Sequence, residues 1–384
     1  MFDKIPLAWL QLTREKIRLL VAVAGITFAD TLMFMQLGFQ DALFDSSTRM
    51  HQNLTGDLVL ISPKSEALIA MQTFSWRRLY QTLAVPGVES VNPLYMGLIN
   101  WKNPDTKRDR QILVLGFDPK TSVFTMSEVE ANIPNIKLPD VVIFDRSSRA
   151  EFGSIAPAIE AGKTVTTEVG GRRVYVKGLF SLGASFAADG NIITSDLNFL
   201  RIFSRRNKGE IDAGIINLQP GADREKVLAD IQALLPDDVK VLTMEGFIEF
   251  EKTYWRESTA IGFIFGLGVA MGFIVGIVIV YQIIYTDVSD HLSEYATLKA
   301  MGYKNAYFYL VVFQEAFFLA ILGYLPGVPI VMVLYNLTKN ATMLPVAMTA
   351  ARALTVLILT VVMCFISGAI AVRKLQEADP ADIF

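Results

Sequence analysis

Four long apolar stretches constrain this chain more than any other feature of its sequence. They span residues 19–43, 261–285, 306–334 and 354–372, and only three charged side chains fall within them, namely Asp30, Asp41 and Glu315. About 20 consecutive apolar residues are enough for one α-helix to cross the hydrocarbon core of a bilayer. The sequence therefore predicts four transmembrane helices, which excludes a purely cytosolic enzyme and a disordered chain.

The basic residues that flank these stretches predict how the chain is oriented. Lys4, Arg14, Lys16 and Arg18 precede the first stretch, and Arg373 and Lys374 follow the fourth. Because Lys and Arg gather on the cytoplasmic side of membrane proteins, residues 1–18 and 373–384 are expected in the cytoplasm. Lys339 and Arg352 oppose this trend, since they lie on the predicted outer side between the third and fourth spans.

Residues 44–253 are long enough for one or two folded domains, and under this topology they are expected outside the cytoplasm. Short runs rich in Val, Ile, Leu and Phe predict strands at 57–61, 111–117, 141–144, 173–180, 191–194 and 213–218. The apolar spacing of residues 223–235 predicts a helix, which forms a β-α-β unit with the runs at 213–218 and 239–242. The expected fold is thus four transmembrane helices plus a large mixed α/β domain of two lobes, with a lobe boundary near residues 147–163.

Composition excludes several functions. The chain has one cysteine, Cys364, and two histidines, His51 and His291, that lie far apart in the sequence. This leaves no disulfide within the chain and no cysteine-rich or histidine-paired metal site. A net charge of −3 gives no basic footprint for nucleic acid. No nucleophile–base motif is present, so no catalytic residue, metal or bound cofactor is expected in this chain.

The segment 286–305 follows the second span and is expected in the cytoplasm. Its residues 289–302 have the pattern of a short amphipathic helix, and Gly302 is a typical C-terminal stop. Such a helix either contacts a partner protein or rests on lipid headgroups. The pattern alone does not separate these alternatives.

The same segment carries a family resemblance. Residues 294–303 read EYATLKAMGY and are followed by Gln314-Glu315-Ala316 and Gly323, while the last seven residues read ADPADIF. This resembles the permease signature and the D-P-A tail of the FtsX/MacB family of ABC transporters, in which an E-x-A-x-L-K-A-x-G segment couples to the ATPase. Within the family, residues 290–327 are most similar to the permeases of cyanobacterial DevBCA-type exporters.

The resemblance implies a non-catalytic permease subunit of the bacterial inner membrane that transmits motion and whose large domain, residues 44–253, lies in the periplasm. Its implied partners are a second copy of the chain, a separate cytoplasmic ABC ATPase that binds ATP and Mg²⁺, a periplasmic adaptor, a TolC-like outer-membrane duct and membrane lipids. The implied cargo is a glycolipid or another amphiphile. An FtsX-like protein that activates a cell-wall hydrolase and a lipoprotein-releasing permease remain as alternatives.

Residues 294–302 include the expected contacts to the ATPase. Glu294 and Lys299 are predicted as polar contacts, Tyr295 and Leu298 as apolar contacts in its groove, and Gly302 as the helix stop. The alternative is that Glu294 and Lys299 form a solvated pair worth less than about 1 kcal/mol.

Two further features lie inside the spans. Asp30 and Glu315 are expected near one depth, where an unpaired charge costs several kcal/mol, so each should be hydrogen-bonded or protonated. A structural hydrogen bond is favoured over a proton relay. Gly268, Gly272 and Gly276 recur every four residues and predict a face on which another helix packs closely, either from the same chain or from a second copy. The alternative is that glycine is simply common in membrane helices.

Overall fold

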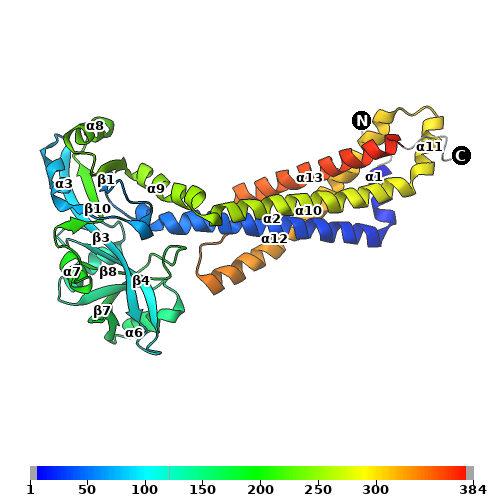
Figure 1. Cartoon of the computed structure of the whole chain (residues 1–384). Helices are drawn as coiled ribbons and strands as arrows, with labels where there is room; N and C mark the ends of the chain where they lie inside the picture. Colours follow the sequence, from blue (N-terminus) through cyan, green and yellow to red (C-terminus); the bar gives the residue numbers. More distant parts are fainter. Residues whose placement is uncertain (1–6, 121, 378–384) are drawn as a thin grey trace. The chain divides into compact units, whose positions relative to one another are not determined.

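The computed structural model describes residues 7–120 and 122–377 (Figure 1). The chain divides into two compact units, each with its own interior. The helical unit comprises the chain up to Asp41, Ala260–Lys339 and the chain from Val346 onward; the α/β unit comprises Ala42–Thr259 with Asn340–Pro345. The D-P-A tail, Ala378–Phe384, lies outside the described residues.

The helical unit contains the four helices that are long and apolar enough to cross a membrane, among the described residues. The helices are α1 (Leu7–Arg14), α2 (Lys16–Gln52), α10 (Ala260–Asp290), α11 (Leu292–Ala300), α12 (Asn305–Thr342) and α13 (Ala350–Glu377). All four long helices extend past the apolar stretches that predicted them, and α2 continues for nine residues beyond residue 43. Hydropathy marks only the part of a helix inside hydrocarbon, whereas backbone hydrogen bonding continues into the polar sequence beyond it.

Polar side chains link the long helices to one another. Thr27 on α2 donates to the carbonyl oxygen of Gly323 on α12 at 2.8 Å, and Ser367 on α13 donates to that of Ile277 on α10 at 2.9 Å. Pro326 lies within α12 without ending it. Neighbouring helices and hydroxyl side chains can satisfy the backbone groups that a proline frees inside a membrane.

Arg352, which opposed the predicted charge bias, is buried at the start of α13. Its guanidinium group contacts Asp41 Oδ2 through Nε at 3.1 Å and through Nη2 at 2.5 Å. The guanidinium also lies 5.4 Å from the ring centroid of Tyr335. The charge of Arg352 is therefore compensated by one of the three charged residues of the apolar stretches.

The α/β unit is built on a nine-stranded mixed sheet in the order β11-β1-β10-β3-β4-β8-β5-β7-β6. Its strands are β1 (Leu58–Ile61), β3 (Val88–Lys102), β4 (Asp109–Phe117), β5 (Val141–Asp145), β6 (Val165–Val169), β7 (Arg172–Phe180), β8 (Asn191–Ser195), β10 (Ala213–Leu218) and β11 (Lys240–Thr243). A second sheet pairs β2 (Phe74–Ser75) with β9 (Glu210–Ile211). All six strands that the sequence predicts are present.

Short helices cover both faces of the large sheet. They are η1 (Leu68–Ala70), α3 (Trp76–Gln81), η2 (Thr82–Ala84), α4 (Ser127–Ala131), α5 (Ile133–Ile136), η3 (Ala150–Phe152), α6 (Ile155–Glu160), α7 (Asp196–Ile202), α8 (Arg224–Leu234), α9 (Met244–Thr253) and the π-turn η4 (Tyr254–Ser258). In β1, Leu58 and Leu60 enter one apolar cluster while Val59 and Ile61 enter the other. Because successive strand side chains point to opposite faces, the sheet is buried on both sides.

The predicted lobe boundary at residues 147–163 is wrong. This segment connects β5 to β6, and its helices η3 and α6 contribute Phe152 and Ile155 to the same apolar cluster as the neighbouring strands. The large sheet is continuous, and β3 joins its two halves because it pairs with β10 up to Leu94 and with β4 from Leu94 onward. Sequence patterns missed β3 because Pro93 and Gly97 interrupt it.

The predicted β-α-β unit is present in a modified form. The strands β10 and β11 flank β1, and both run antiparallel to it, so they are parallel to one another without being adjacent. Asp223 accepts hydrogen bonds from the backbone N–H groups of Glu225 and Lys226 at the start of α8. Val227 and Ile231 then pack α8 onto the sheet.

Candidate coupling site

The segment from the end of α10 to the start of α12 contains the predicted short helix, but this helix begins at Leu292 and not at Ser289, because Ser289 and Asp290 belong to α10. A single residue, His291, separates α10 from α11, which ends shortly before Gly302. Gly302 has a φ of +96°, and the N–H of Tyr303 donates to the carbonyl oxygen of Leu298 at 3.2 Å. This is the pattern of a helix that a glycine terminates in the left-handed conformation.

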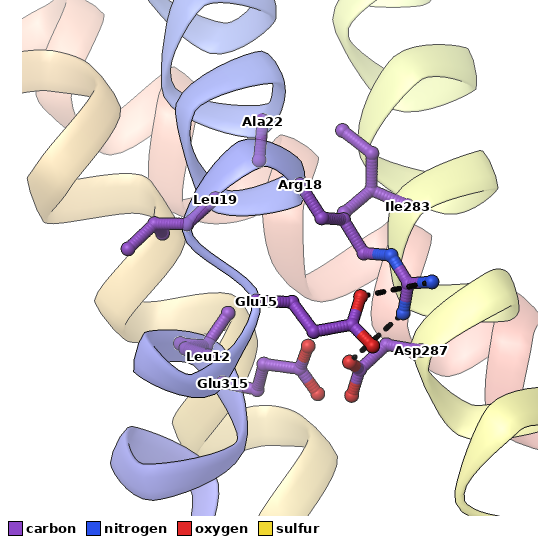
Figure 2. Close-up of a pocket in the computed structure, with 8 residues that line it drawn as sticks. All are labelled: Leu12, Glu15, Arg18, Leu19, Ala22, Ile283, Asp287 and Glu315. Atoms are coloured by element: carbon purple, nitrogen blue, oxygen red, sulfur yellow. Dashed lines mark hydrogen bonds and ion pairs between the residues drawn. The ribbon is translucent and has the colours of Figure 1, made fainter.

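A charged cluster joins the base of α11 to the start of α2. Arg18 on α2 contacts Asp290 Oδ2 at 2.5 Å and Asp287 Oδ1 at 3.5 Å, both on the last turn of α10. It also contacts Glu15 at 3.0 Å, and Figure 2 shows its guanidinium group between Glu15 and Asp287. His291 Nδ1 lies 2.9 Å from the carbonyl oxygen of Asp287. The residue before α11 is thus anchored to a helix end that Arg18 holds against α2.

Glu315 on α12 faces the same cluster. Its side chain is fully buried, and it lines a small pocket with Glu15, Arg18 and Asp287, in which its carboxyl group points towards that of Asp287 (Figure 2). The pocket therefore brings together α1, α2, α10 and α12. The sequence predicts Glu315 as a site residue. It marks Arg18 only as a basic residue that flanks the first span, and it gives no signal for Asp287.

The predicted ATPase contacts on α11 differ in exposure. Glu294 is exposed, whereas Leu298 is half-buried and packs against the apolar cluster of the long helices. The side chains of Tyr295 and Lys299 lie outside the described part of the structure. Leu298 thus packs α11 against the long helices of the helical unit.

Asp30 and Glu315 do not lie near one depth. Asp30 on α2 lies beside Gly327, whose position would place a Cβ 3.6 Å from Asp30 Cβ. Gly327 is twelve residues after Glu315 on α12, which corresponds to about 18 Å along a helix. Asp30 is fully buried, and its Oδ1 lies 2.6 Å from Thr360 Oγ1. The expectation of equal depth fails because α12 and α2 do not begin at the same level.

The glycine row packs against helices of the same chain. A Cβ at Gly272 would lie 3.1 Å from Met33 Cγ and 3.5 Å from the carbonyl oxygen of Ala29, both on α2. Gly268 faces Gln36 on α2, and Gly276 faces Met363 on α13. Small residues allow such close approach between membrane helices.

Within the described residues, no group of three or more His, Cys, Asp or Glu side chains is arranged to hold a metal ion. The site is instead a set of charged and small side chains at helix contacts. Its chemistry suits the transmission of movement between helices.

Two family comparisons cover most of the chain. The MacB-like periplasmic core domain matches residues 19–234, which is more than half of the chain, and the FtsX-like permease C-terminal domain matches residues 266–380. The chain therefore belongs to the MacB/FtsX-type permease family of ABC transporters. It is a membrane protein of four candidate spans with a large periplasmic α/β domain, and its family implies partnership with a cytoplasmic ABC ATPase.

Solved structures similar to this chain are periplasmic or extracellular regions of related proteins. The periplasmic region of MacB from Actinobacillus actinomycetemcomitans is 11% identical, with a TM-score of 0.35, and the match covers 50% of this chain and 91% of that one. The extracellular domain of the noncanonic ABC-type transporter YknZ from Gram-positive bacteria is 16% identical, with a TM-score of 0.30, and coverage of 48% and 99%.

A permease-protein domain from Porphyromonas gingivalis is 13% identical, with a TM-score of 0.29, and coverage of 50% and 88%. Because these TM-scores are below 0.5, the family assignment rests on the two domain matches alone. None of the curated proteins compared with this chain matches it.

Proposed function

We propose that this chain is the permease subunit of an ABC exporter and passes ATP-driven motion from α11 to its periplasmic domain. The observation that carries this proposal is the cluster around Arg18, which joins the end of α10 to the start of α2 directly beside α11. Packed helices with fixed polar contacts transmit displacement as units. Both α2 and α10 are continuous with segments of the α/β unit, so movement of α11 has a direct path to it.

The proposed assembly is a homodimer bound to two copies of a separate cytoplasmic ATPase, which holds ATP and Mg²⁺. Both termini of the permease lie in the cytoplasm. The contacts to the ATPase come from α11, with Glu294 on its exposed face and Tyr295, Lys299 and Gly302 nearby. Leu298, which packs inward, transfers the motion of α11 to the long helices.

The proposed cargo is a glycolipid or another amphiphile taken from the periplasmic side. The similarity of residues 290–327 to DevC, the permease of DevBCA-type exporters, supports this choice. The partners in that arrangement are a DevA-like ATPase, a DevB-like periplasmic adaptor and a TolC-like outer-membrane duct.

The test is Glu294→Lys in the full chain reconstituted with its ATPase. Reversing the charge on the exposed face of α11 should reduce permease-stimulated ATP hydrolysis several-fold, because charge reversal at a contact weakens association. Glu225→Lys is the matched control, since Glu225 is exposed on α8 of the α/β unit, and it should leave stimulation unchanged. Equal stimulation by both variants would contradict the coupling role of α11.

Partner identity separates export from the two alternatives. Crosslinking followed by affinity purification should recover the ATPase together with a periplasmic adaptor. Recovery of a cell-wall hydrolase in place of the adaptor would indicate the signalling function. Release of lipoproteins from membranes containing the reconstituted complex would indicate the lipoprotein-releasing function.

A further inference from the structure

A buried carboxyl group ties together two segments of the α/β unit that are distant in sequence. Glu251 on α9 is fully buried, and its Oε2 accepts a hydrogen bond from the backbone N–H of Leu68 in η1 at 2.7 Å. Its Oε1 accepts a hydrogen bond from Trp255 Nε1 in the π-turn η4 at 2.8 Å. Carboxyl groups are almost never fully buried unless they are paired.

Among the residues that the structure describes, the titratable side chain at ion-pair distance from this carboxyl group is a histidine. His51 lies on the last turn of α2, its side chain is also fully buried, and its Nε2 is 3.7 Å from Glu251 Oε2. Its ring packs edge-on against Phe247 with the ring centroids 4.3 Å apart. Among the described elements around Glu251, η1, α9 and η4 contribute no other titratable side chain at ion-pair distance.

The position of this cluster in the chain gives it mechanical significance. The helix α2 is continuous with the first span, whereas α9 leads through η4 to the second span at Ala260. Glu251, His51, Leu68 and Trp255, here called the Glu251 latch, therefore join the segments that lead to two different spans. Single-turn π segments within helical runs occur frequently at functional sites.

We propose that the Glu251 latch is operated by a proton: it is closed while Glu251 is protonated, and it opens as that proton is lost. Glu251 accepts two hydrogen bonds, but among the described residues no Lys or Arg pairs with it, and its side chain is fully buried, so its charged form is costly. Admitting water relieves this cost, which releases η1 from α9. This proposal concerns a conformational change within the α/β unit, and it does not depend on the proposed export function.

The protonation behaviour of Glu251 agrees with this geometry. Burial raises the pKa of Glu251 from 4.5 to about 7, against the opposing effect of the hydrogen bonds from Leu68 and Trp255. Because the pKa in the folded state lies above that in the unfolded state, the stabilisation from the protonated group is fully present below about pH 4.5. It is lost as the pH rises through about 7, so the latch should open above neutral pH.

The test measures hydrogen exchange in the purified full chain at pH 6 and pH 8.5. After correction for intrinsic rates, peptides containing Leu68 should exchange about tenfold faster at pH 8.5, since with a pKa of about 7 the deprotonated fraction of Glu251 rises from about one tenth at pH 6 to nearly all at pH 8.5. Peptides containing Ile193, which is buried in β8, serve as the internal reference. Equal protection of Leu68 at both pH values in the unmodified protein would overturn the proposal.

Glu251→Gln and Glu249→Gln form a matched pair of variants on α9. The first removes the titrating group while keeping its shape, so the pH effect at Leu68 should disappear. The second removes an exposed carboxylate that pairs with Arg256 at 3.1 Å, so the pH effect should remain. Retention of the effect in Glu251→Gln would assign it to another group and overturn the proposal.

Infrared difference spectra between the two pH values identify the group directly. The carbonyl band of a protonated carboxyl group should decrease at pH 8.5 in the unmodified protein and in Glu249→Gln. If Glu251→Gln does not fold, two measurements on the unmodified protein still test the proposal. The latch is contradicted if the exchange of Leu68 does not increase at pH 8.5, and also if the carbonyl band does not decrease. All of these measurements use the permease alone, so their failure would leave the proposed export function untouched.

Discussion

At the scale of single residues, Asp30 shows how an intramembrane acid is accommodated. Thr360 Oγ1 lies 2.6 Å from Asp30 Oδ1 and 2.8 Å from the carbonyl oxygen of Val356. A threonine hydroxyl has one hydrogen to donate. Thr360 donates this hydrogen towards Asp30 Oδ1, and the carbonyl oxygen of Val356 lies close enough to share it.

This arrangement predicts different outcomes for two substitutions of Asp30. Asp30→Asn should be tolerated within about 1 kcal/mol, because the amide oxygen accepts the hydrogen bond from Thr360 as Asp30 Oδ1 does. Asp30→Leu should destabilise the protein by about 1–3 kcal/mol, because a buried polar group loses its partner and a larger side chain is introduced. Thermal unfolding of the purified full chain in detergent measures both. Loss of transport by Asp30→Asn with normal assembly would favour a proton relay.

The sequence identified the charged residues of the spans but not their partners. Hydropathy singles out Asp30, Asp41 and Glu315 because charges are rare in apolar stretches. Their partners Thr360 and Arg352 follow them by more than three hundred residues, and only the packing of α13 against α2 brings them together. A single sequence contains no signal for such contacts between helices.

At the scale of helices and strands, the glycine row is the clearest case in which spacing predicted packing. The four-residue repeat predicts a face without side chains, and the structure places Gly272 against α2. The choice between a contact within the chain and a contact with a second copy needed the structure. The strand β3 was missed, because patterns that treat proline and glycine as breaks fail where tertiary pairing spans them.

The helix contact predicts that Gly272→Leu is far more disruptive than Gly266→Leu. Leu at residue 272 would overlap Met33 and the backbone of Ala29, and such overpacking typically costs 1–3 kcal/mol. Gly266 lies on the same helix, and a Cβ there would meet nothing within 4 Å. Thermal unfolding in detergent should show a lower midpoint for Gly272→Leu only. Similar midpoints would mean that the row reflects composition alone.

At the scale of the whole molecule, the division into a helical unit and an α/β unit follows directly from the sequence. Apolar stretches locate the long helices, and alternating or continuous apolar runs locate six strands of the sheet. The order of the strands could not be predicted from the sequence, because β1 lies between β10 and β11 through pairings that span more than 150 residues. Local patterns specify elements, whereas long-range pairing specifies how they are joined.

The last prediction concerns the orientation of the chain in the membrane. Four spans place both termini on one side, and the basic residues around the first and fourth spans favour the cytoplasm. Arg352 and Lys339 are the basic residues on the predicted outer side between the third and fourth spans. Because Arg352 pairs with Asp41, its charge is neutralised, and only the charge of Lys339 opposes the predicted orientation. The N-terminus, the C-terminus and the turn between α11 and α12 should therefore be cytoplasmic.

Reporter insertions test this topology at positions that the structure shows to be open. A reporter after Gly162, an exposed turn residue with nothing within 4 Å of a Cβ, should be periplasmic without disturbing the sheet. One inserted between Tyr303 and Lys304, which are both exposed, should be cytoplasmic, as should reporters fused at either terminus. Because α10 is the span between the two internal sites, the four-span topology requires these sites to lie in opposite compartments. If both internal reporters lay in the same compartment, α10 would not cross the membrane. The proposed path from α11 to the periplasmic domain would then be contradicted.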